Sequence, residues 1–280
     1  MTVPPEIDWI GRWRSIVEAR MDQIQRFQPA HAGRPPSHWD GLASTFSRLA
    51  ERTDPGNDPV LSLVRKRISP EKTLLDIGAG AGRYAVHLAP HVRQVIAVEP
   101  SAGMRAALAE QVAKRELSNV TVVACAWQEA EVEPADVVLV ANVLYWTADI
   151  APFLRRLRAH ARERCLIVQR ATQSSAAFAP LWEELWGEPQ APQPDFQDLY
   201  NVLFQLGAKP DARLFQTAHH RWSSLEEAID RATRELLIPE DHPSRARVRQ
   251  FVEATAVLRD GYWTDPNPTW IGVADVPATS

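Results

Sequence analysis

The sequence predicts an α/β fold in which helices cover both faces of a doubly wound, mostly parallel sheet. Its strand-like segments, such as residues 73–77, 94–98 and 135–141, are short continuous apolar runs without polar alternation. Such runs are typical of strands that are buried on both faces of a parallel sheet. Helical segments separate them, as the crossover connections between parallel strands require. A glycine-rich segment follows the first run, where doubly wound folds bind ligands.

The first part of the chain is predicted to be helical. Apolar residues recur at helical spacing over residues 6–25, which predicts an amphipathic helix. The proline-rich segment 28–36 ends it, and shorter helices are expected at 38–50 and 59–67. We therefore expect an N-terminal helical cap over residues 1–55 and a ligand-binding domain over residues 56–280.

Five strands and three helices are predicted in the regular part of the sheet. Ser101 is expected to cap the second of these helices and Asp149 the third, because their side chains can accept from unpaired amides of the first turn. Pro152 lies in a first turn, where its missing N–H does no harm. The strands are expected at 73–77, 94–98, 120–124, 135–141 and 165–169, and the helices at 82–88, 101–115 and from 149 onward.

The pattern is less regular after Arg170. Two helices at 224–237 and 244–259 separate the last two predicted strands, which lie at 213–219 and 269–274. This connection is long for a compact domain, and insertions of this length tend to be lids or pocket walls. We expect a helical lid over about residues 223–262, preceded by helices at 174–187 and 196–206.

Composition and charge narrow the function classes. The chain has 280 residues, 45% of them hydrophobic, and a formal net charge of −4, so no overall basic field would attract nucleic acid. Residues 1–10 lack the features of a signal peptide, and no apolar run approaches the roughly 18 residues of a membrane helix. We expect a cytoplasmic protein, monomer or homodimer, without a membrane partner. Cys125 and Cys165 lie in strand-like runs, which indicates core thiols and no metal site.

The segment 74–82 carries the functional prediction. Gly78, Gly80 and Gly82 allow a sharp turn between strand and helix and let a ligand approach the backbone. A dinucleotide fingerprint starting at Gly78 would place Arg83 at its third small position, where the side chain is too large for close packing. Asp76 precedes the loop and would repel a pyrophosphate, whereas it can pair with the ammonium of a methionine moiety.

This pattern, Asp-x-Gly-x-Gly-x-Gly after an apolar strand, resembles the first motif of the class I S-adenosylmethionine-dependent methyltransferases. The resemblance continues over residues 59–170 and implies S-adenosylmethionine as the cofactor. It also implies a seven-strand sheet with one antiparallel late strand. In that family an acid at the position of Glu99 holds both ribose hydroxyls. The cofactor-binding residues that the resemblance implies are Asp76, Gly78, Ala79, Gly80, Gly82, Glu99, Pro100, Met104, Ala126, Trp127, Asn142 and Val143.

Two positions depart from the family pattern. Where the family often has an Asp that binds the adenine amine, this chain has Cys125, a poor acceptor, so adenine recognition passes to backbone groups or to Gln128. The Pro-Gly-Gly turn that usually precedes the fifth strand is replaced by residues 162–164, which we expect to alter only the turn.

The resemblance implies methyl transfer to an acceptor, and the aromatic residues favour a small, partly apolar metabolite. The candidate pocket residues are Trp39, Tyr145, Trp146 and His219, each of which could instead have an ordinary packing role. No catalytic base is assigned. Two alternatives stay open: a non-catalytic protein that binds S-adenosylmethionine or S-adenosylhomocysteine, and a methyltransferase that acts on RNA or protein.

Overall fold

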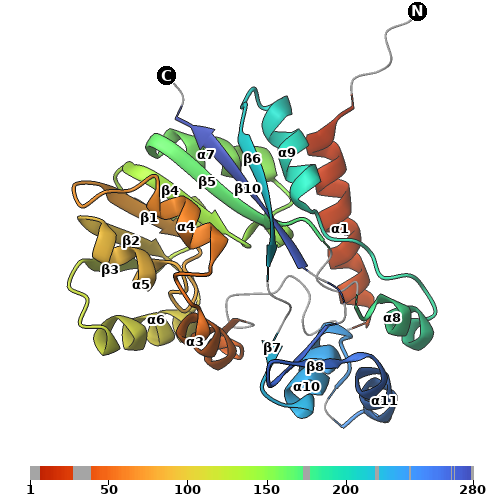
Figure 1. Ribbon diagram of the computed structural model, residues 1–280. Helices are drawn as coiled ribbons and strands as arrows, with labels where there is room; N and C mark the ends of the chain where they lie inside the picture. The colour runs from red at the N-terminus through yellow and green to blue at the C-terminus, as the bar shows by residue number, and fades with distance from the viewer. Residues whose placement is uncertain are drawn as a thin grey trace, which may run out of the picture.

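A seven-stranded sheet runs through the computed structural model in Figure 1, which describes residues 7–27, 39–172, 177–217, 221–239, 241–265, 267 and 269–278. The strand order is β3-β2-β1-β4-β5-β10-β6, and only β10 is antiparallel to its neighbours. The predicted doubly wound sheet with one antiparallel late strand is therefore confirmed. The strands are β1 (Thr73–Ile77), β2 (Gln94–Val98), β3 (Val120–Val123), β4 (Ala135–Ala141), β5 (Ala161–Arg170), β6 (Asp211–Thr217) and β10 (Thr269–Pro277).

Successive residues of the central strands face opposite helical layers, as the two-residue period of a strand requires. Leu74 and Val137 belong to the core on one face, whereas Leu75 and Val138 belong to the core on the other, and all four are fully buried. Because both faces are covered, these strands have no polar side, which explains the continuous apolar runs in the sequence.

Helices of the described part of the chain cover both faces of the sheet (Figure 1). On one face lie α4 (Pro59–Arg65), α5 (Ala85–Leu88) and α6 (Ala102–Lys114). On the other lie α1 (Trp9–Phe27), α7 (Ile150–Ala159) and α9 (Phe196–Gln205). The Ser101 side chain accepts from the Met104 N–H at 3.1 Å, so its predicted capping of α6 is confirmed.

The N-terminal helices lie in two different places. Helix α1 belongs to the layer over the sheet, where Trp13 is fully buried and its Nε1 donates to the Thr147 carbonyl at 2.8 Å. Helix α3 (Ala43–Arg52) instead packs beside α6. The division of the chain near residue 55 stays a prediction.

The chain between β6 and β10 forms a small unit beyond one edge of the sheet (Figure 1). We call residues 221–265, as far as they are described, the C-terminal cap. It contains α10 (Leu225–Glu235), α11 (Arg245–Thr255) and a three-stranded sheet of β7 (Arg221–Trp222), β8 (Val257–Arg259) and β9 (Tyr262–Thr264). Its core joins α8 (Ala179–Trp186) through Phe178, Leu181 and Trp182.

The cap corrects the predicted helix over residues 244–259. The helix ends at Thr255, and Arg259 pairs with Tyr262 across a two-residue turn. Both turn residues, Asp260 and Gly261, have positive φ angles of 50° and 78°. This is the backbone that an Asp-Gly hairpin turn favours, so a hairpin replaces the last helical turn.

Three further expectations on local structure were wrong. The Asp149 side chain makes no capping hydrogen bond and instead pairs with Arg14 at 2.5 Å. Residues 162–164 form no turn, because β5 already begins at Ala161 and its early residues pair with β4 and β10. The helix expected from residue 82 begins at Ala85, after the glycine loop has turned.

Candidate cofactor site

The glycine loop between β1 and α5 turns sharply at three left-handed positions. Gly78, Gly80 and Gly82 have φ angles of 67°, 56° and 88°, a region that side chains with a Cβ rarely adopt. A Cβ on Gly78 would lie 2.5 Å from Val143 Cγ2, and one on Gly82 would lie 2.5 Å from Leu108 Cδ1. At Gly80 a Cβ would meet no atom within 4 Å. Packing therefore requires Gly78 and Gly82, whereas Gly80 faces open space that a ligand can enter.

Glu99 ends β2 beside this loop and holds it in place. Its Oε2 accepts from the Gly80 N–H and its Oε1 from the Ser101 N–H, both at 2.8 Å. Burial raises the pKa of Glu99, and the two backbone donors oppose that increase. Each carboxylate oxygen has a second lone pair, so both can accept one more hydrogen bond, as a ribose diol would supply.

Asp76 is a buried carboxylate next to Glu99. It is 2% exposed, and its Oδ2 has no hydrogen-bond partner in the described structure. Burial, and secondly the nearby charge of Glu99, raise the pKa of Asp76 to about 7. An unpaired buried carboxylate costs stability unless a cation compensates it. The ammonium of S-adenosylmethionine fits this requirement, and a pyrophosphate does not.

The loop after β4 forms the third wall of the site. Asn142 has a φ of 58°, a left-handed conformation that Asn tolerates better than most residues. The Tyr145 hydroxyl donates to Asn142 Oδ1 at 2.9 Å and accepts from the Arg170 N–H at 3.1 Å. Burial raises the pKa of Tyr145, which keeps this hydroxyl protonated. The hydroxyl therefore braces the loop between β4 and β5, and this arrangement does not suit a general base.

The residues predicted to flank adenine are placed differently from one another. Met104 is buried beside Ala81 at the glycine loop. Trp127 is 3% exposed and packs against Arg156 of α7 and His160 at the end of α7. Its indole therefore belongs to the core, so a contact between this side chain and adenine is not what the structure places there.

Asp40, in the segment before α3, forms hydrogen bonds with residues that follow Glu99. The sequence did not indicate this contact. Asp40 Oδ1 accepts from Ser101 Oγ at 2.6 Å and from the Gly103 N–H at 2.8 Å. A Cβ on Gly103 would lie 2.8 Å from Asp40 Cα, so this approach requires glycine. Trp39 thereby comes into the same small cluster as Met104 and Ala81.

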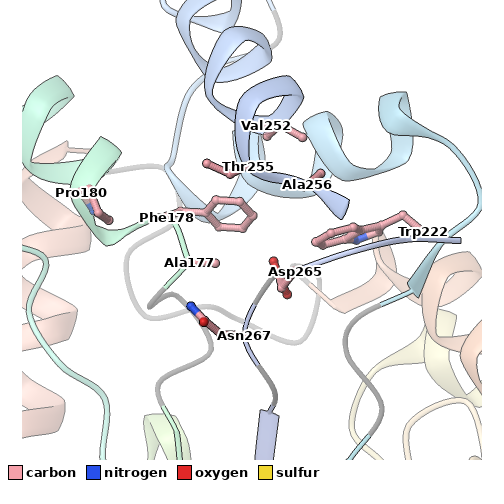
Figure 2. A pocket seen from close by; sticks show the side chains of 9 residues that line it. All are labelled: Ala177, Phe178, Pro180, Trp222, Val252, Thr255, Ala256, Asp265 and Asn267. Carbon is pink, nitrogen blue, oxygen red and sulfur yellow. The ribbon is translucent and has the colours of Figure 1, made fainter. Parts of the chain in front are cut away.

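The candidate acceptor residues divide between the sheet edge and the cap. Trp146 packs against the cap core that contains Trp222, and Trp263 packs against the same core. His219 lies outside the described residues, so its role stays a prediction. Sequence reasoning did not find the cavity that Figure 2 shows between the cap and the start of α8, because its walls come from segments far apart in the chain.

The comparisons with known proteins agree with this geometry. Residues 75–167 match the family model described as a methyltransferase domain. An uncharacterized protein of Haemophilus influenzae is 28% identical over 193 residues, which cover 67% of this chain and 69% of that protein.

Two solved structures share the fold at 15% sequence identity. YcgJ of Bacillus subtilis has a TM-score of 0.53, with 78% of this chain and 98% of that chain covered. A Bacillus halodurans protein assigned as a methyltransferase has a TM-score of 0.55, with 79% and 99% covered.

The family match begins inside β1 and ends inside β5. It therefore includes the glycine loop, Glu99 and the Asn142 loop, the three walls described above. Residues 75–167 therefore form a methyltransferase domain, and this domain carries the three walls of the candidate site.

Proposed function

We propose that this enzyme transfers the methyl group of S-adenosylmethionine to a small, partly apolar metabolite held between the sheet edge and the C-terminal cap. The observation that carries the acceptor proposal is the contact between Trp146 and the core of the cap. Trp146 belongs to the loop that walls the cofactor site, so the cap lies next to the place where an acceptor would meet the methyl group.

Each wall of the site has a role toward the cofactor in this proposal. Glu99 binds the ribose hydroxyls, Asp76 pairs with the ammonium, and the backbone at Gly80 lies against the ligand. Pro100 and Met104 cover one side of the adenine, while Ala126 and Trp127 approach it through their backbones. Asn142 and Val143 line the methionine moiety.

S-adenosylmethionine supplies a methyl group that is already activated by its sulfonium. The protein therefore has mainly to align the acceptor in line with that methyl and to exclude water. Tyr145 fixes the Asn142 loop, and the aromatic residues of the cap provide apolar walls. The acceptor atom would bond to the methyl carbon as the carbon–sulfur bond breaks, leaving S-adenosylhomocysteine. An amine or hydroxyl acceptor would release its proton to solvent, and no side chain is assigned as a base.

The charge of the molecule supports a small acceptor over a nucleic acid. The chain has a formal net charge of −4, and Asp76 and Glu99 place carboxylates at the site itself. Such a surface lacks the overall positive field that attracts a polyanion. No helix in the described ranges is both long and apolar enough to cross a membrane.

A labelling experiment tests the acceptor class. The protein is incubated with methyl-tritiated S-adenosylmethionine and a whole-cell extract, and the label is then followed through dialysis. We expect the label in dialysable products other than the cofactor. Label retained in RNA or protein would show that the acceptor is a macromolecule and would contradict the proposal of a small acceptor.

The matched control is Asp76→Asn, which keeps the size of the side chain and removes the charge that pairs with the ammonium. It should bind cofactor poorly and label nothing. A wild-type protein that binds S-adenosylmethionine tightly yet labels no fraction would instead support a non-catalytic binder.

A further inference from the structure

A partly open cavity of about 180 Å³ lies where the C-terminal cap meets the segment before α8. Figure 2 shows Phe178 and Trp222 on its two sides and Asp265 between them. Among the described residues the walls come from four segments of the chain, with the lining residues Ala177, Phe178, Pro180, Trp222, Val252, Thr255, Ala256, Asp265 and Asn267.

The cavity lies beyond the same edge of the sheet as the cofactor site. Asp265 and Asn267 immediately precede β10, whose Ile271 pairs with Arg170 at the carboxyl end of β5. The carboxyl ends of β1 and β4, which carry the glycine loop and Asn142, are at this edge as well. Phe178 and Trp222 also share their core cluster with Trp146.

The size of the cavity limits the ligand to about one ring. An apolar cavity of roughly 150 Å³ in another protein accommodates benzene, so about 180 Å³ accommodates a six-membered ring with one small substituent. A nucleotide or a long acyl chain would extend well beyond the cavity. The aromatic faces of Phe178 and Trp222 offer a planar ring favourable contacts.

One carboxylate determines the polarity of that substituent. Asp265 is 8% exposed and lines the cavity, and an ionised carboxylate only accepts hydrogen bonds. The Thr255 hydroxyl donates to the Phe251 carbonyl at 2.8 Å, so toward the cavity it offers acceptor lone pairs. A ligand that presents an O–H or N–H group can donate to oxygens of both residues.

We propose that this cavity binds the ring of the methyl acceptor, and that the acceptor is a single-ring molecule carrying a hydroxyl or amino group. The assignment of this ring to the methyl acceptor rests on the proposed methyl-transfer function. The binding of a ring in the cavity does not depend on that function, so the experiment measures ring binding and cofactor binding separately.

The probe is 4-fluorophenol, whose binding is followed by fluorine NMR in the presence of S-adenosylhomocysteine. Two substitutions from different walls fill the cavity, Ala256→Leu after α11 and Ala177→Leu before α8. The matched control is Ala254→Leu, an exposed position on α11 that does not line the cavity. Cofactor affinity, measured by calorimetry on each variant, reports whether the site and the fold are intact.

We expect 4-fluorophenol to bind the wild type and Ala254→Leu equally, and each cavity-filling variant about tenfold more weakly or not at all, with cofactor affinity unchanged. 4-Fluorotoluene, which replaces the hydroxyl with a methyl group of similar size, should also bind about tenfold more weakly than 4-fluorophenol. Equal probe binding by the wild type and both cavity-filling variants, or no binding to the wild type, would overturn the proposal. A failure of the wild type to bind cofactor would instead overturn the proposed function and leave the probe result to decide the cavity.

Discussion

At the scale of single residues, the site combines two buried carboxylates whose surroundings differ. Glu99 accepts two backbone hydrogen bonds, whereas the Oδ2 of Asp76 has no partner in the described structure. The strand carrying Asp76 is fixed by the sheet, so the fold does not remove this cost by moving the side chain. The Ala85 N–H lowers the pKa of Asp76 but does not offset its burial, so a cationic ligand group would complete the compensation.

The raised pKa of Asp76 predicts that cofactor affinity depends on pH. The form that pairs with an ammonium is the ionised carboxylate, and below about pH 7 most molecules carry the protonated carboxyl, which must lose its proton before it can pair. Affinity should therefore fall about tenfold from about pH 7.5 to about pH 6. Calorimetric titrations at the two pH values measure this, and Asp76→Asn should bind weakly at both. A wild-type affinity that is constant over this range would contradict the pairing.

The burial of Asp76 also predicts that the protein becomes more stable when this side chain loses its charge. Because the folded-state pKa lies above the unfolded value, Asp76 increasingly destabilises the fold as pH rises from about 4 to about 7, and the penalty is constant above that. Without cofactor, Asp76→Asn should therefore exceed the wild type in free energy of unfolding by a few kcal/mol near pH 8, and by little near pH 4. Urea denaturation at both pH values tests the difference. An Asn variant less stable than the wild type at pH 8 would show that the carboxylate is paired in the native fold.

At the scale of elements, the glycine loop and the strands around it could be predicted because their signals are local. Continuous apolar runs mark β1, β2 and β4, and positive φ angles are needed where the glycines occur. The cap was harder to predict. The Asp260-Gly261 turn is present in the sequence, but the apolar residues before it also suit a helix, and only pairing with β9 decides between them. The Asp40 contact and the cavity depend on distant segments, so no local pattern indicates them.

The packing of α3 on α6 predicts that a small change at Gly103 loosens the N-terminal segment. A Cβ there would lie 2.8 Å from the Asp40 backbone, so Gly103→Ala should displace Asp40 from Ser101. Amides of residues 43–52 should then exchange faster with deuterium, and cofactor affinity should fall because Trp39 leaves the Met104 cluster. Asp40→Asn, which keeps an acceptor oxygen, is the milder control. Unchanged exchange in Gly103→Ala would mean that α3 is held by other contacts.

At the scale of the whole molecule, one rigid sheet carries the cofactor site and a separate cap lies over its edge. The sheet is buried on both faces, whereas the cap packs into a third core that it shares with α8 and with Ile24 of α1. Segments that gate substrate entry are generally drawn from the less stable parts of a structure. The arrangement therefore favours a cap that opens and closes while the cofactor walls stay fixed.

Hydrogen exchange tests this division. Amides of α10 and α11 should be less protected than those of β1, β4 and β5 in the free protein. Addition of S-adenosylhomocysteine together with a bound acceptor analogue should increase their protection, whereas S-adenosylhomocysteine alone should mainly protect the glycine loop and residues 99–104. Equal protection of cap and sheet in the free protein would indicate that the cap is a fixed part of the fold.

If the glycine loop and Glu99 hold S-adenosylmethionine, isothermal titration of the cofactor into Glu99→Ala will show a loss of affinity. The variant loses the acceptor for both ribose hydroxyls, so its binding free energy should weaken by about 1.5–3 kcal/mol. Glu99→Gln keeps one acceptor oxygen, so its affinity for the cofactor should lie between the affinities of Glu99→Ala and the wild type. Gly80→Val, which adds a branched side chain where the structure leaves open space, should abolish binding. A folded Glu99→Ala protein with wild-type affinity would contradict the account.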